Sequence, residues 1–251
     1  MQLWHVGRVS HPVFLQGKLP ISSSETTMTG KISRSPGLTF GKSRAATQHE
    51  IKELINYYAL AAKNAIKAGF DGIELHGANG YLIDQFLHYH TNKREDEYGN
   101  TPENMSHFAI EIVKACGDSI GYERVGLRLS PGGYLNEIIG DERDYLVFQH
   151  LLKQLNQYKI AYVHTGNFND EVKFKELHEM TMTQFMRQYY TGNLIACGNY
   201  TFEHARERIE QHDFDLVSVG RPFIANPDLI ERLMHHKEIV QYTPDMLNVL
   251  Y

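Results

Sequence analysis

The sequence predicts an α/β fold, namely a (β/α)8 TIM barrel built around parallel strands. Short runs rich in β-branched residues alternate with helical patterns along the 251 residues, and no linker or low-complexity tract interrupts them. Consecutive strands must be parallel, because each helix carries the chain back to the same end of the sheet. Polar or glycine-rich turns follow five of the six runs, as expected where strand ends surround one mouth. We therefore expect one domain over residues 1–251, with strands at residues 2–6, 72–76, 125–130, 160–164, 194–198 and 216–220.

Helix start signals lie between these runs. Thr47 and Glu50 have the spacing of a capping box and precede a long apolar repeat. Thr101 and Pro102 place a cap and a first-turn proline before a second helix, which we expect to end at Gly117. Further helices are predicted around Tyr145 to Leu155 and after Thr181, Thr201 and Asn226.

Composition and charge exclude several classes of function. The 25 basic and 30 acidic residues give a net charge of −5 without blocks, so we expect neither nucleic acid nor membrane as a partner. No apolar run approaches the ~18 residues of a spanning helix, and the N-terminus has no signal core, so the expected location is cytoplasmic. Cys116 and Cys197 are predicted to be buried and reduced. The scattered histidines lack carboxylate or cysteine partners at metal spacing, so no metal site is expected.

The segment from His76 to Tyr81 carries three chemically active side chains in six residues. His76 and Asn79 can donate hydrogen bonds to one oxygen, and Tyr81 can supply a proton from another direction. The glycines at positions 77 and 80 allow the tight turn that this requires. An equally supported alternative is that the histidine and asparagine cap the next helix, with the tyrosine in the core.

Two glycine turns near the C-terminus predict a phosphate site. Gly198 with Asn199, and Gly220 with Arg221, follow the last two strands, where barrels often present backbone N–H groups to a phosphate. The alternative is two ordinary turns and a surface arginine. Arg128 is a charge in an otherwise apolar strand, so it needs an anion or polar ligand nearby or, alternatively, an internal salt bridge.

Residues 11–46 form a connection that is long for a βα unit and rich in Ser, Thr, Gly and Lys. Because it follows the first strand at the mouth, we interpret it as a lid. If the two glycine turns follow strands seven and eight, residues 2–6 form the third strand. The sequence then predicts a barrel that lacks its first two βα units.

Several segments together resemble the old yellow enzyme family, and most closely its N-ethylmaleimide reductase type. The matching segments are residues 2–8, 68–82, 84–87, 92–99 and 220–229. The resemblance implies a TIM barrel that holds FMN noncovalently. It also implies reduction by NAD(P)H and reoxidation by a small α,β-unsaturated carbonyl compound or a similar electrophilic alkene.

The resemblance further implies a role for each site residue. His76 and Asn79 would bind the carbonyl oxygen of the substrate, Tyr81 would protonate its α-carbon, and Trp4 would line the pocket. The expected cofactor contacts are Gln2 and Arg128 for the flavin ring, and Gly198, Asn199, Gly220 and Arg221 for the FMN phosphate.

The sequence also departs from the family. Family members begin with two further βα units and end in a longer glycine-rich tail, so we expect a truncated barrel with two exposed sheet edges. A second copy or a complementing chain could cover them. The alternative function is a noncatalytic barrel remnant or interaction module with weak or no FMN binding. A phosphate-binding lyase or isomerase would explain the two glycine turns, but no strand end carries a Schiff-base lysine.

Overall fold

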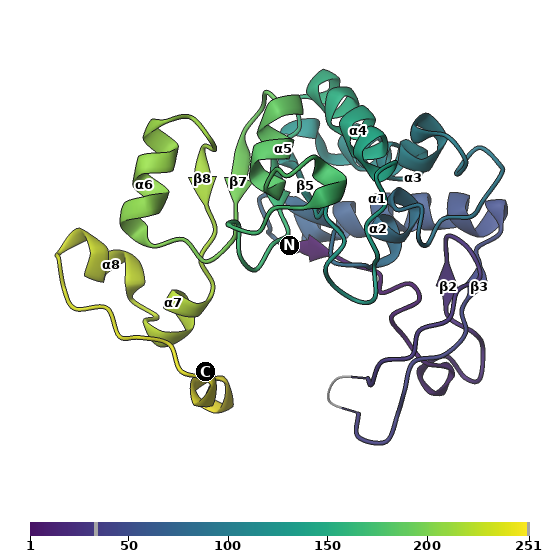
Figure 1. Cartoon of the computed structure of the whole chain (residues 1–251), viewed down its shortest axis with the longest axis horizontal. Helices are drawn as coiled ribbons and strands as arrows, with labels where there is room; N and C mark the ends of the chain where they lie inside the picture. The colour runs from purple at the N-terminus through teal and green to yellow at the C-terminus, as the bar shows by residue number, and fades with distance from the viewer. Residues whose placement is uncertain (33–34, 250–251) are drawn as a thin grey trace.

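A six-stranded parallel sheet forms the centre of the computed structural model, which describes residues 1–32 and 35–249. Its strands follow one another in sequence order (Figure 1). All six predicted strands are present, each shorter than or shifted by one residue from its prediction. They are β1 (Gln2–Leu3), β4 (Ile73–Gly77), β5 (Val125–Leu129), β6 (Tyr162–Thr165), β7 (Leu194–Ala196) and β8 (Leu216–Val217).

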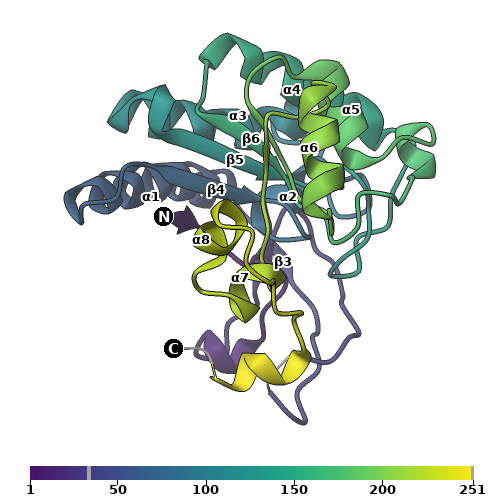
Figure 2. The same ribbon diagram turned by 90° about the vertical axis from the view of Figure 1, so that its left-hand side faces the viewer.

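Five helices lie along one face of the sheet, and the first four of them pack against one another in succession (Figures 1 and 2). They are α1 (Gln48–Lys67), α3 (Pro102–Ile120), α4 (Asp144–Tyr158), α5 (Met182–Tyr189) and α6 (Phe202–Glu210). Three short helices follow strand ends or close the chain: α2 (Leu82–Leu87), α7 (Arg221–Ala225) and α8 (Leu229–Met234). Single 3-10 turns lie at Pro12–Phe14, Tyr122–Arg124, Lys175–Leu177 and Pro244–Val249. In the described part, no helix is both long and apolar enough to cross a membrane.

The two faces of the sheet differ in chemistry because side chains alternate along each strand. Leu75, Leu127 and Val163 are in register, point toward the helices and are fully buried in the hydrophobic core. The next residues along β4, β5 and β6 are His76, Arg128 and His164, which are again in register and face the other side. The core therefore lies between sheet and helices, and the opposite face, hereafter the inner face, is polar.

The helix starts were predicted correctly, but one helix end was not. Capping boxes are present at Thr47 and Thr181, and Thr101 accepts a hydrogen bond from the backbone of the first turn of α3. The predicted end of α3 at Gly117 is wrong, because the helix continues to Ile120. A Cβ at Gly117 would lie 2.4 Å from the ring of Tyr122, so this glycine allows close packing inside the helix.

The segment 11–46 forms a small layer of its own beside the ends of β1 and β4. It contains the parallel pair β2 (Ile21–Ser22) and β3 (Arg44–Ala45), and two of its residues, 33 and 34, lie outside the described residues. Its base is fixed by Arg94, whose guanidinium donates to the carbonyls of Ser23 (3.0 Å) and Ala46 (2.7 Å). In Figure 1 this segment and the α7–α8 region both extend from the same side of the sheet.

A buried charged cluster joins α2 to α4 directly behind the turn that follows β4. His88 lies 2.8 Å from Asp144 and 3.4 Å from Asp84, and all three side chains are almost completely buried. Burial alone would lower the pKa of His88, but the two carboxylates outweigh it and raise this pKa to about 10. Asp84 also accepts the Gly80 N–H at 2.7 Å. The cluster therefore holds the turn as well as the helices.

Because of this cluster, we expect the free energy of unfolding to fall at alkaline pH. Because the folded-state pKa of His88 is raised, its contribution is complete below the unfolded value of about 6.5 and is lost as pH rises toward about 10. We expect a slope of about 1.4 kcal/mol per pH unit from this group. Denaturant unfolding of wild type and His88→Gln between pH 6 and 10 measures it. Equal pH slopes in both proteins would contradict the assignment.

Candidate active site

Three aromatic side chains meet at the carboxyl ends of β1 and β4. The ring centroids of Trp4 and Tyr81 are 4.8 Å apart, those of His76 and Tyr81 are 5.1 Å apart, and those of Trp4 and His76 are 6.0 Å apart. Trp4 is 54% exposed, whereas His76 is 6% exposed. The Tyr81 hydroxyl makes no hydrogen bond to any described residue. The structure thus brings together these three predicted residues, with a free phenol at the surface of the cluster.

The backbone of Asn79 is held in an unusual conformation by the loop after β5. Asn79 has a φ of 62° and Gly80 follows with a φ of 76°, a left-handed pair that favours Asn and Gly. The Asn79 N–H donates to the Ser130 hydroxyl at 2.7 Å, and its carbonyl accepts from the Asn136 amide at 2.7 Å. Tyr81, with no capping side chain, is the N-cap of α2. The alternative interpretation of His76 and Asn79 as caps is therefore wrong.

Tyr134 orients the Asn79 side chain, a role that the sequence did not predict. Its hydroxyl lies 2.7 Å from Asn79 Oδ1 and 2.6 Å from the Gly166 carbonyl. Burial raises the pKa of Tyr134, so the phenol stays protonated, and its single proton is shared between these two acceptors. With Oδ1 engaged, the Asn79 NH2 group remains available as a donor. No local pattern reveals this residue, because the contact joins loops 55 positions apart.

His76 is a neutral imidazole at pH 7. Burial and, next, the positive charge of Arg128 lower its pKa to about 4. Its Nδ1 is buried without a partner in the described part of the chain. A neutral ring carries one N–H, so His76 can donate one hydrogen bond to a ligand oxygen.

Arg128 lies on the inner face without a carboxylate partner. It is opposite His76 on one side and His164 on the other. Its Nε is buried and unpaired, and no acidic side chain of the described residues lies within salt-bridge distance. The alternative of an internal salt bridge is therefore wrong for the described chain, and Nε remains available to a ligand.

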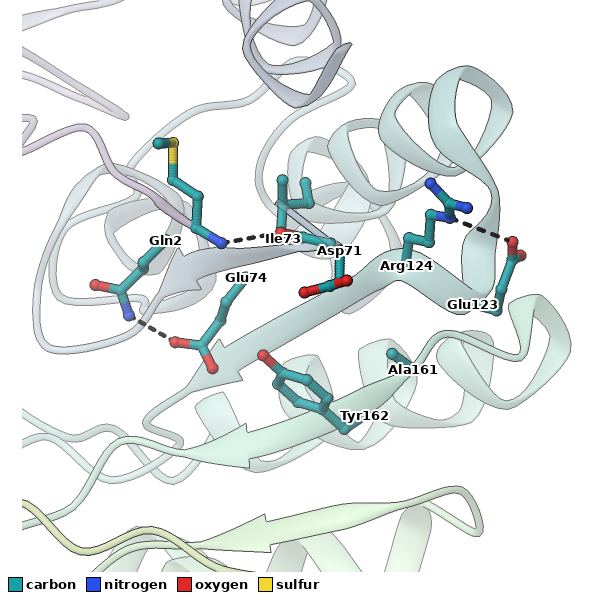
Figure 3. A pocket seen from close by; sticks show the side chains of 10 residues that line it. Gln2, Asp71, Ile73, Glu74, Glu123, Arg124, Ala161 and Tyr162 are labelled. Carbon is teal, nitrogen blue, oxygen red and sulfur yellow. Dashed lines mark hydrogen bonds and ion pairs between the residues drawn. The ribbon is translucent and has the colours of Figure 1, made fainter. Parts of the chain in front are cut away.

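Gln2 is positioned by a hydrogen-bonded chain across the inner face. Its Nε2 donates to Glu74 Oε1 at 2.6 Å (Figure 3), and Glu74 Oε2 lies 2.8 Å from His164 Nδ1. The side-chain oxygen of Gln2 stays free as an acceptor.

Figure 3 shows Gln2 and Tyr162 beside a cavity of about 450 Å³. That cavity lies at the amino ends of the strands, whereas barrel sites lie at the carboxyl ends.

The predicted phosphate residues are only partly gathered. Asn199, Gly220 and Arg221 line one cavity of about 310 Å³ after β7 and β8, and a Cβ at Gly220 would meet no atom within 4 Å. Gly198 does not line this cavity. Its Cβ position lies 2.5 Å from the backbone nitrogen of Asp170, whose N–H donates to the Gly198 carbonyl at 3.1 Å. Gly198 therefore shapes the turn through close backbone packing.

One prediction about the cysteines is wrong. Cys116 is buried in α3, as expected, but Cys197 is partly exposed and lines the same 310 Å³ cavity. The residue follows β7 directly, so strand alternation turns its side chain to the inner face.

Comparison with known proteins decides the family. Residues 1–239 match the model of the family described as "NADH:flavin oxidoreductase / NADH oxidase". The chain belongs to this family. The flavin oxidoreductase hxnT of Emericella nidulans is 38% identical over 96% of this chain. A putative 12-oxophytodienoate reductase 11 of Oryza sativa subsp. japonica is 40% identical over 92% of it. The chain spans about two thirds of these relatives, 66% and 64% of their lengths.

Solved structures of family members show the same fold. The old yellow enzyme homologue of Zymomonas mobilis superposes with a TM-score of 0.88 at 32% identity, over 98% of this chain and 69% of that one. Morphinone reductase in complex with tetrahydroNAD gives 0.85 at 36% identity, over 98% and 68%. The predicted architecture, a partial TIM barrel of six parallel strands, and the resemblance to old yellow enzymes are thereby confirmed. FMN is the family's cofactor and a nicotinamide nucleotide its reductant, as expected.

The residues present fit FMN. The unpaired Nε of Arg128 and the free side-chain oxygen of Gln2 offer a donor and an acceptor on the inner face, as a flavin ring edge requires. Arg221 begins α7 beside the open Gly220 position, and a guanidinium at a helix start suits a phosphate.

The low pKa of His76 can be measured directly. Histidine ring NMR signals of the chain without ligand, assigned with His76→Gln, should show a midpoint near pH 4. Arg128→Met should move this midpoint upward, because it removes a neighbouring positive charge. A wild-type midpoint at or above the model-peptide value of about 6.5 would contradict the prediction.

Proposed function

We propose that this chain acts as an FMN-dependent NAD(P)H oxidoreductase that reduces the activated C=C bonds of α,β-unsaturated carbonyl compounds. The observation that carries the proposal is the arrangement after β4. Neutral His76, the oriented amide of Asn79 and the free phenol of Tyr81 lie at the carboxyl ends of the strands, and the buried Nε of Arg128, opposite His76, is unpaired. Oxygen-binding donors, a proton donor and a cofactor contact are thus presented together.

The cofactor would be held by residues from β1 and β5 and from the turns after β7 and β8. Gln2 and Arg128 would contact the flavin ring, and the phosphate would bind at Asn199, Gly220 and Arg221, with Gly198 shaping the turn. When bound, FMN supplies the hydride that is transferred to the substrate's β-carbon.

The chain's own side chains would polarise and protonate the substrate. His76 and Asn79 would donate to the carbonyl oxygen, where negative charge develops as the hydride arrives. Because Tyr134 and Ser130 fix Asn79 beforehand, this donor needs little reorganisation. Tyr81 would give its proton to the α-carbon, and Trp4, in edge contact with Tyr81, would form the outer wall.

The segment 11–46 would act as a lid over this site. Glu137 supports the proposal, because its carboxylate accepts the N–H groups of Thr29 (3.1 Å) and Gly30 (2.7 Å). The preceding residue, Asn136, binds the Asn79 carbonyl. One short loop therefore touches both the segment and the turn that carries the chemistry.

A second candidate is a flavin-free interaction module. It is favoured by the two edge strands of the sheet, β1 and β8, because the outer side of each is not paired with any strand of the described chain. A second copy or another chain could pair there. The two candidates differ in whether the chain binds FMN, and size-exclusion chromatography would report the pairing.

FMN binding tests the proposal. We expect the chain mixed with FMN to retain a yellow chromophore that bleaches with NADPH and recovers with cyclohexenone. Arg128→Met should weaken FMN binding by about tenfold to a hundredfold, the usual effect of losing a charged hydrogen bond. Arg124→Met, an exposed arginine in the 3-10 turn just before the same strand, is the matched control. A colourless chain at saturating FMN would support the interaction module instead.

Tyr81→Phe separates the two half-reactions. Loss of the proton donor should slow reoxidation by cyclohexenone by about a hundredfold, while flavin reduction by NADPH stays at the wild-type rate. Stopped-flow absorbance measures both steps. Tyr122→Phe removes a hydroxyl that bonds only to Asp118 on the surface and should change neither rate. Equal loss in both half-reactions of Tyr81→Phe would refute the assigned role.

A further inference from the structure

Glu74, His164 and Cys197 form a row across the inner face that the proposed reaction does not use as chemistry. Glu74 Oε2 lies 2.8 Å from His164 Nδ1. His164 is opposite Ile195 in β7, so Cys197, two positions further, is its diagonal neighbour on the same face. Carboxylate, imidazole and thiol, from β4, β6 and the end of β7, therefore form a row that passes over β5.

The imidazole in this row has an unused nitrogen. His164 is 8% exposed, and its Nε2 has no hydrogen-bond partner among the described residues. Glu74 occupies the other ring nitrogen, so Nε2 is the atom left for the thiol side. Burial alone lowers the pKa of His164, but Cys197 and Glu74 raise it above its usual value. A positive imidazolium beside a thiol favours the thiolate.

The pKa values of the two cysteines of the chain are shifted in opposite directions. Burial alone would raise the pKa of Cys197, but His164 and the charge of Arg128 outweigh it and lower this pKa. Burial raises the pKa of Cys116 to about 12. Cys197 lines the 310 Å³ cavity whose wall includes Phe168, Val219 and Ile224, whereas Cys116 is buried in α3. Asn199 and Arg221 also line it, so a small, largely apolar reagent with one oxygen acceptor suits the space.

We propose that Cys197 is a covalent modification site for soft electrophiles, of which α,β-unsaturated carbonyl compounds are the class. The thiolate sulfur bonds to the β-carbon as the C=C π bond breaks, and its electron pair moves to the enolate oxygen. The enolate then takes a proton at the α-carbon from His164 or water. One thiol and one alkene give one thioether, without oxidant or reductant.

The site is also linked to the cofactor, and this part rests on the proposed function. Cys197 shares its cavity with Asn199, Gly220 and Arg221, the residues proposed to hold the FMN phosphate. Bound FMN and a Cys197 adduct therefore exclude each other. Loss of FMN would expose the thiol to the same class of compound that the loaded site reduces.

Alkylation of the full chain without FMN tests the thiol, with Cys116 as the internal control. Iodoacetamide is the probe, and peptide mass spectrometry follows both cysteines at pH 7. Cys197 should react at least about tenfold faster than Cys116, as a low-pKa accessible thiol does. Cyclohexenone without NADPH should add one molecule at Cys197, and Cys197→Ala should abolish this adduct. Equal rates at the two cysteines, or no enone adduct, would overturn the proposal.

Two variants test the row itself. His164→Gln removes the ring, and Glu74→Gln removes the negative charge behind it, and each should slow alkylation of Cys197 while leaving that of Cys116 unchanged. Faster reaction at both cysteines would signal unfolding of that variant, and the remaining variant then decides. Unchanged Cys197 rates in a folded variant would refute the role of the row.

Saturating FMN tests the link to the cofactor. It should slow alkylation of Cys197 by about tenfold or more, as expected for occlusion of the thiol, and leave Cys116 unchanged. If the visible spectrum shows bound FMN without protection, the shared-cavity claim is wrong. If the spectrum shows no bound FMN, the proposed function fails, while the result without FMN still decides whether Cys197 is the modification site.

Discussion

The alternation of side chains along short parallel strands is the constraint on which this structure depends. On one face, Leu75, Leu127 and Val163 are fully buried against the helices, and burial of such side chains is the main source of stability. Because the residues between them must face the other way, the inner face is free to carry His76 and Arg128. Stability and chemistry are thus divided between odd and even positions of the same strands.

The features that the sequence revealed are those encoded locally. The six strands and the caps at Thr47 and Thr181 depend on neighbours a few residues away, and the structure contains them. The end of α3 was mispredicted because Gly117 lies inside the helix, where its missing side chain makes room for the ring of Tyr122. Cys197 was mispredicted because its exposure depends on the position of β8 and α7, not on its own surroundings in the chain.

The turn after β4 shows what separates a motif from a site. The spacing of His76, Asn79 and Tyr81 allowed two interpretations, and contacts distant in sequence distinguish them. Ser130 and Tyr134 come from the loop after β5, and they hold Asn79 in a left-handed conformation away from the start of α2. The motif supplies the donors, but the neighbouring strand determines where they point.

Three buried nitrogens on the inner face couple ligand binding to folding. His76 Nδ1, Arg128 Nε and His164 Nε2 are in one register row across β4, β5 and β6, and each lacks a partner among the described residues. An unsatisfied buried polar atom costs about 1–3 kcal/mol, which is large beside a total stability of about 5–15 kcal/mol. A ligand that bonds to this row removes part of that cost in the folded state only, so it stabilises the fold as it binds. Two side chains of this row, His164 and Arg128, also lower the pKa of Cys197. Cofactor binding and thiol reactivity therefore depend on the same face of the sheet.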